Sequence, residues 1–131
     1  MNSRVLAVLL LTSLTFVPLA FANPEVRFDY TTKQCRNFGD GQLEWDSRPW
    51  GIGGKTFSQI CKKCHNRKND KAPFLYVESK TSKGWNRVFA QRKVKCAKDG
   101  SWDGMTLDQQ LRLNDYLFRF AAFSQDAYHN Y

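Results

Sequence analysis

The feature that most constrains this chain is a five-residue run, Cys61-Lys62-Lys63-Cys64-His65. Two thiols three positions apart lie about one helical turn from each other, and a histidine follows directly. This spacing lets both sulfurs add to the two vinyl groups of one haem, with the histidine beneath the iron as its fifth ligand. The run is typical of c-type haem attachment and predicts one covalent haem c. Cys61 and Cys64 would form the thioethers and His65 would be the proximal iron ligand.

Three other uses of the two cysteines compete with haem. A redox-active pair would follow a buried strand, and the segment before Cys61 does not have the pattern of one. A zinc site needs further ligands close by, whereas Cys35 and Cys96 are distant along the chain. A structural disulfide between two cysteines within one helical turn has poor geometry. The sequence therefore favours haem over these three uses.

The N-terminal residues 1–22 have the pattern of a secretory signal peptide. Arg4 precedes an apolar run, and Ala20-Phe21-Ala22 matches the small-residue cleavage pattern. The apolar run is too short for a membrane span, although a retained N-terminal anchor is the alternative. Cleavage would lower the formal net charge from +8 to +7 by removing Arg4. We therefore expect a periplasmic or otherwise exported protein, with no stable membrane span after cleavage, in a compartment where disulfides persist.

The remaining sequence predicts one small domain preceded by an arm. Residues 23–52 have turn-forming and aromatic residues without periodicity, which predicts an irregular arm packing Trp45 and Trp50 against the body. Residues 53–131 would form the haem-binding domain. Helices are expected over 53–65, over 84–90 and over a last segment that ends near Phe123. Thr106 begins this last segment with a capping box.

Two further segments support the haem interpretation, because they resemble segments of a known protein family. Gly54 and Phe57 precede the first cysteine, and Leu113 and Tyr116 lie on the last predicted helix. At these positions the chain resembles the class I cytochrome c family, of the exported bacterial type with one haem. In that family the glycine and aromatic residue of the first helix contact the leucine and aromatic residue of the last. The resemblance covers the two ends of a domain and implies an all-α fold around one haem.

The same resemblance implies a methionine as the distal iron ligand, and Met105 is the one methionine outside the predicted signal peptide. Met105 directly precedes the capping Thr106, which is closer to the last helix than is usual in the family. A thioether filling the core is the alternative role. An open distal position is a further possibility. The other candidate distal ligands are Lys93, Lys95, Lys98 and His129.

Two cysteines remain outside the motif. Cys35 lies in the predicted arm and Cys96 in the loop before Trp102. In an oxidising compartment they predict an intramolecular disulfide that would tie the arm to the haem domain. Free thiols or an intermolecular bridge are the alternatives.

Charge is concentrated around the motif. Between Cys61 and Lys98 there are 12 lysines and arginines and two acidic residues, a local charge of +10. A basic rim would attract redox proteins with acidic surfaces, and we expect no nucleic-acid partner for an exported protein. The sequence has no group of residues typical of a catalytic site, so it does not predict an enzyme. The expected function is one-electron transfer between periplasmic or membrane partners. The alternatives are binding of a small gas at an open iron, or service as the haem subunit of a larger oxidoreductase.

Overall fold

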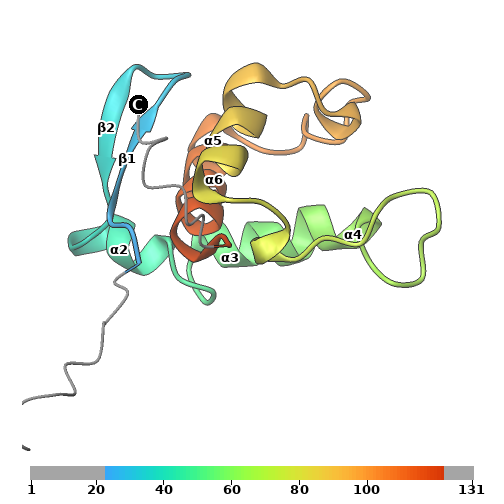
Figure 1. Cartoon of the computed structure of the whole chain (residues 1–131), viewed down its shortest axis with the longest axis horizontal. Coiled ribbons are helices and arrows are strands. Elements are labelled where there is room, and N and C mark those ends of the chain that lie inside the picture. Colours follow the sequence, from blue (N-terminus) through green and yellow to red (C-terminus); the bar gives the residue numbers. More distant parts are fainter. Residues whose placement is uncertain (1–22, 123–131) are drawn as a thin grey trace, which may run out of the picture.

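The computed structural model describes residues 23–122, and its fold begins with a β-hairpin (Figure 1). Strand β1 (Val26–Asp29) pairs antiparallel with β2 (Gln34–Asn37), with Arg27 opposite Arg36. The short helix α2 (Gly41–Asp46) follows the hairpin. The predicted all-α fold with an irregular arm is therefore wrong, because residues 23–52 contain a two-stranded sheet and a helix.

The sequence pattern does not predict the hairpin, because its charged side chains face the core and its apolar side chains face solvent. Arg27 and Asp29 face inward and are buried, whereas Val26 and Phe28 are exposed. The Arg27 Nε atom donates to Asp115 Oδ1 at 2.7 Å, and its Nη1 atom donates to Asp29 Oδ2, also at 2.7 Å. Buried charges are tolerated where partners satisfy them, so ion pairs, rather than an apolar face, hold the hairpin on the last helix.

After α2 the chain forms one continuous helical rod that contains Cys61 and Cys64. It consists of α3 (Ile52–Thr56), the π-helical turn η1 (Phe57–Cys61) and α4 (Lys62–Cys64). Figure 1 shows this rod extending away from the hairpin, with the loop that follows α4 at its far end. The helix predicted over 53–65 is confirmed, but its π-helical turn is not evident from the sequence.

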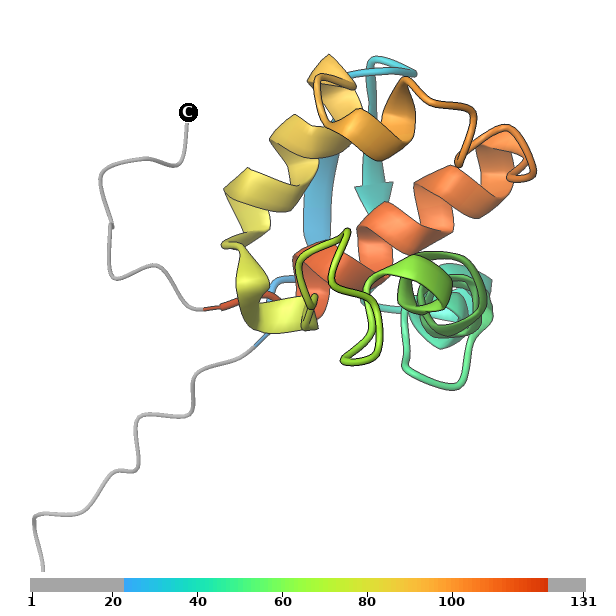
Figure 2. The same ribbon diagram turned by 90° about the vertical axis from the view of Figure 1, so that its right-hand side faces the viewer.

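Within residues 23–122, four helical elements follow the rod along the chain. They are η2 (Val77–Ser79), α5 (Ser82–Gln91), η3 (Lys95–Ala97) and α6 (Leu107–Phe120). The predicted capping box of α6 is confirmed, since Gln109 N donates to Thr106 Oγ1 at 3.2 Å and Thr106 N donates to Gln109 Oε1 at 2.9 Å. Helix α6 ends at Phe120, before the predicted Phe123, which lies outside the described residues. Helix α6 packs against both α3 and α5, and Figure 2 shows α6 beside the rod.

Close contact between α3 and α6 depends on a glycine. A Cβ atom on Gly53 would lie 2.3 Å from the carbonyl oxygen of Arg112 and 2.6 Å from Cβ of Tyr116. The ring of Phe57 lies 6.0 Å from that of Tyr116 at the same crossing. The contact expected from the resemblance is present, but Gly53 makes it. Gly54 instead lies against Pro49.

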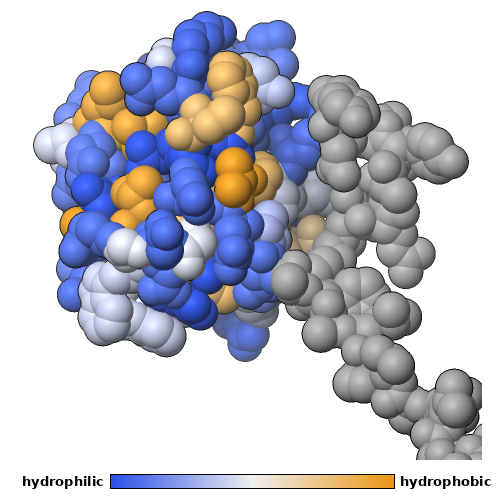
Figure 3. Space-filling model, turned by 90° about the vertical axis from the view of Figure 1, so that its left-hand side faces the viewer, coloured by the Kyte–Doolittle hydropathy of each residue, from blue (hydrophilic) through white to orange (hydrophobic). Residues whose placement is uncertain are grey.

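The core lies where α5, α6 and the rod meet. Its buried members are Phe57, Trp85, Phe89, Trp102, Met105, Leu113, Tyr116 and Leu117. Trp45 and Trp50 do not pack against it as predicted. They are 56% and 52% exposed and contact each other edge to face at 6.1 Å. Figure 3 shows the hairpin side of the molecule, where separate apolar groups lie within a largely hydrophilic surface.

Candidate cofactor site at Cys61, Cys64 and His65

The helical rod presents the three motif residues at its end. Cys61 closes the π-helical turn, and His65 N donates to the carbonyl oxygen of Cys61 at 2.8 Å. Cys61 and His65 are therefore one α-helical turn apart, and Cys64 lies on the same turn. π-Helical turns are rare and frequently occur at functional sites, because they change which side chains share a face.

The two thiols have different surroundings. Cys61 packs against the core, whereas Cys64 is exposed. Burial, together with smaller effects of the charges of Cys96 and Cys64, raises the pKa of the Cys61 thiol to about 12. A nucleophilic redox cysteine requires a lowered pKa. The surroundings of Cys61 therefore disfavour the thiol–disulfide alternative, and they place its sulfur at the edge of the apolar core.

The imidazole of His65 is oriented by a main-chain oxygen. Its Nδ1 atom lies 2.7 Å from the carbonyl oxygen of Pro73. A carbonyl oxygen only accepts hydrogen bonds, so Nδ1 carries the proton and donates it to this bond. The Nε2 atom then keeps its lone pair. This arrangement, with one ring nitrogen anchored and the other free, is that of a metal-ligating histidine.

The loop that supplies Pro73 is fixed by contacts back to the helix. Lys62 Nζ donates to the carbonyl oxygen of Leu75 at 2.7 Å and lies 3.6 Å from the centre of the Phe74 ring. Asn69 Nδ2 donates to the carbonyl oxygen of Cys64 at 2.7 Å. These bonds hold the loop beside α4, as Figure 2 shows. Sequence reasoning missed Pro73 and Lys62, because a backbone acceptor and a motif spacer residue give no pattern of their own.

Zinc has no ligand set at this site. Among residues 23–122, no group of three or more histidine, cysteine, aspartate or glutamate side chains is placed to hold a metal ion. The two cysteines and the histidine instead fit haem, in which the thiols bind carbon and only the imidazole binds metal. The donor set at Cys61, Cys64 and His65 thus suits a covalent haem.

Met105 lies in the core. Its side chain is 5% exposed and belongs to the same cluster against which Cys61 packs. Its backbone is also fixed, because Met105 N donates to the carbonyl oxygen of Trp102 at 3.0 Å and Gln110 Nε2 donates to the carbonyl oxygen of Met105 at 3.2 Å. This position agrees with a core-filling thioether, and its role as an iron ligand stays a prediction.

The other candidate distal ligands are less favourably placed. Lys93, Lys95 and Lys98 are exposed around η3. His129 lies outside the described residues. Within residues 23–122, the structure therefore buries Met105 alone of these candidates.

Cys35 and Cys96 are both free thiols. Cys35 is exposed on β2, whereas Cys96 lies in η3 and packs against the core beside Cys61. The structure does not join them, so the disulfide between them stays a prediction. The predicted signal peptide, residues 1–22, lies outside the described residues, and in the part that is described no helix has the length and apolar character to cross a bilayer.

The chain was compared with protein families, curated proteins and solved structures. No family model, curated protein or solved structure matches this chain significantly.

Proposed function

We propose that this chain is an exported c-type haem protein that transfers one electron at a time between redox partners. The observation that carries the proposal is the oriented His65 ring, whose Nδ1 is held by Pro73 while Nε2 remains available one turn from Cys61. A histidine that only filled space or faced solvent would need no such anchor. Together with two cysteines at the attachment spacing, it makes a complete proximal set.

Each residue has a distinct part in this arrangement. Cys61 and Cys64 would hold the haem by thioethers, each formed when a thiol's sulfur and hydrogen add across a vinyl double bond, without an oxidant. Haem bound there supplies a one-electron iron couple. His65 would bind the iron through Nε2, and the carbonyl oxygen of Pro73 keeps the ring in the required tautomer and increases its basicity.

The surroundings suit electron transfer. Core packing on the Cys61 side would exclude water from the haem and limit the rearrangement that accompanies a change of charge. The basic residues between Cys61 and Lys98 would steer partners with acidic surfaces, with association rates that fall as ionic strength rises.

Stepwise loss of the attachment residues tests the proposal. The variants Cys61→Ala and Cys64→Ala should each keep one thioether, and the double variant should keep none. Haem staining after denaturing electrophoresis measures the covalent link, and Cys35→Ala is the matched control because that thiol is exposed on the hairpin. Staining retained in the double variant would overturn the proposal.

A haem subunit of a larger oxidoreductase is the second candidate, because the arm exposes two adjacent tryptophans. Trp45 and Trp50 are each more than half exposed and stack edge to face, and adjacent exposed aromatic rings are enriched at protein interfaces. Crosslinking in extracts of the native source distinguishes the two roles. A stable complex lost on Trp45→Ser and Trp50→Ser substitution would favour the subunit, whereas an unchanged monomer favours the soluble carrier.

A further inference from the structure

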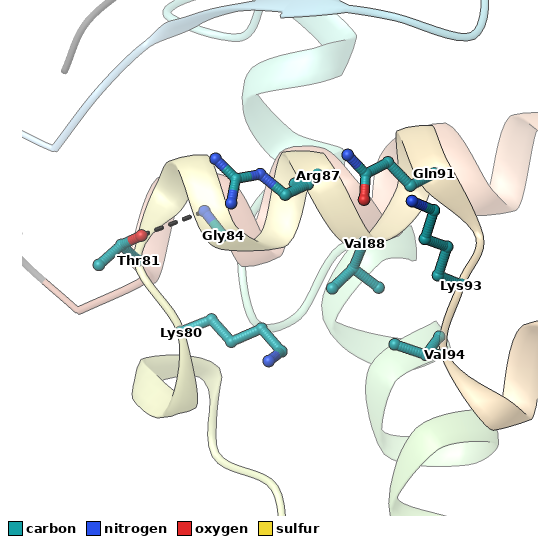
Figure 4. Close-up of a pocket in the computed structure, with 8 residues that line it drawn as sticks. All are labelled: Lys80, Thr81, Gly84, Arg87, Val88, Gln91, Lys93 and Val94. Carbon is teal, nitrogen blue, oxygen red and sulfur yellow. Dashed lines mark hydrogen bonds between the residues drawn. The ribbon is translucent and has the colours of Figure 1, made fainter.

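A pocket on the surface beside α5 is lined by side chains that the haem proposal does not use. Its volume is about 390 Å³, and Figure 4 shows Arg87 and Lys93 along one side of α5 and Lys80 on the other. Val88 and Val94 lie between these cations. Cys61, Cys64 and His65 are not among its lining residues.

Three cations line the pocket: Lys80, Arg87 and Lys93. In the part of the chain that the structure describes, Lys80, Arg87 and Lys93 form no ion pair. Lys80 Nζ instead lies 5.9 Å from the centre of the Trp85 ring. No aspartate or glutamate lines the pocket. Like charges held around one hollow repel each other, and an anion placed between them removes that repulsion.

The floor of the pocket is apolar and belongs to the core. Val88 and Val94 both pack against the core cluster that Cys61 also contacts. Gly84 also lines the pocket, and a Cβ atom there would lie 3.2 Å from Cβ of Lys80. A fully hydrated inorganic anion would gain little from two valines, whereas an apolar group attached to a carboxylate would bury surface against them.

We propose that this pocket binds a carboxylate attached to an apolar body. Arg87, Lys80 and Lys93 would bind the carboxylate oxygens, and Val88 and Val94 would contact the apolar part. Two sources have this chemistry: a free amphiphilic carboxylate, and the propionate edge of a haem held at Cys61 and Cys64. The first source is independent of the proposed function, and the second rests on it.

Titration of the purified full chain with octanoate tests the free source. The expected result is saturable binding with shifts of the Val88 and Val94 methyl resonances. Binding should weaken at least tenfold in the double variant Lys80→Gln/Arg87→Gln. The control Lys55→Gln/Lys68→Gln removes two positive charges outside the pocket and should leave the affinity within twofold.

The propionate source is tested on the haem-loaded protein by infrared difference spectroscopy of the propionate carboxylates. If propionates occupy the pocket, octanoate does not bind, and the double variant shifts the propionate bands while the control does not. Absence of octanoate binding together with unchanged propionate bands overturns the proposal, as does octanoate binding of equal affinity in both double variants. If the chain carries no haem, the proposed function is refuted. Octanoate binding then decides the pocket proposal by itself.

Discussion

The Nδ1 atom of His65 lies 2.7 Å from the carbonyl oxygen of Pro73, eight residues further along the chain. This single bond orients the imidazole ring of a partly exposed histidine and defines its tautomer. Lys62 supports it from the helical rod by donating to the carbonyl oxygen of Leu75 and lying over the ring of Phe74. A helix and the loop that returns along it thus form the surroundings of His65.

The distal role of Met105 can be separated from its packing role. Met105→Leu keeps most of the buried volume, whereas Met105→Ala should cost about 2–5 kcal/mol of stability. If the thioether binds iron, both variants lose the weak near-infrared thioether band of the ferric protein and bind carbon monoxide when reduced. If Met105 only packs, Met105→Leu retains the wild-type spectrum and an open-iron, gas-binding role becomes the better account.

Gly53 should be intolerant of any side chain. Gly53→Ala places a Cβ atom 2.3 Å from the carbonyl oxygen of Arg112, so α3 and α6 must separate. We expect a loss of at least about 1–3 kcal/mol in the free energy of unfolding, measured by guanidinium denaturation. Gly104→Ala is the control because nothing lies within 4 Å of its added Cβ. Equal stability of the two variants would contradict the close crossing.

The hairpin should depend on Asp115. Its carboxylate is buried and accepts hydrogen bonds from Arg27 and Arg36, so Asp115→Asn leaves charge uncompensated. We expect a loss of about 3–5 kcal/mol in the free energy of unfolding. Asp108→Asn breaks an ion pair whose carboxylate is 59% exposed and should cost less than about 1 kcal/mol. A hairpin that stays protected from amide exchange in Asp115→Asn would refute this role.

Acid should weaken the same region through Asp29. Burial raises the pKa of this carboxyl, but hydrogen bonds from Arg27 and Thr32 outweigh it and hold the pKa below its ordinary value of 3.8. A lowered pKa in the folded state means that the stability contributed by Asp29 is complete above the unfolded pKa. That contribution is lost as the pH falls through the folded pKa.

The variant Asp29→Asn checks this pH dependence. Urea denaturation between pH 6 and about pH 3 should show a shallower loss of stability in the variant than in the wild type. Parallel curves for the two proteins would show that Asp29 does not contribute.

The sequence predicted the helices better than the arm. The cap at Thr106 and the helix over 84–90 are predicted from local sequence, and both agree with the folded chain, in which α5 spans Ser82–Gln91. The hairpin was missed because Arg27 and Asp29 occupy its buried face. A charged residue inside a fold is satisfied only by partners far away in sequence, and no local pattern reveals them.

The site was predictable to a similar extent. The motif singles out Cys61, Cys64 and His65, because covalent haem attachment would require their spacing, and their role stays a prediction. The anchor at Pro73 was not predictable, because any residue offers a carbonyl oxygen and only the folded loop selects one. The choice of Gly53 rather than Gly54 at the helix crossing also required the geometry, since adjacent glycines are equivalent in sequence.

If the proposed function is right, the exported chain carries one covalent haem. Expression with export and haem-attachment machinery, followed by intact-mass measurement after extraction with acidified acetone, tests it most directly. The account predicts a polypeptide heavier by one haem, with the added mass on the peptide containing Cys61 and Cys64. Recovery of the unmodified mass, with both thiols open to alkylation and the haem removed by the solvent, would contradict it.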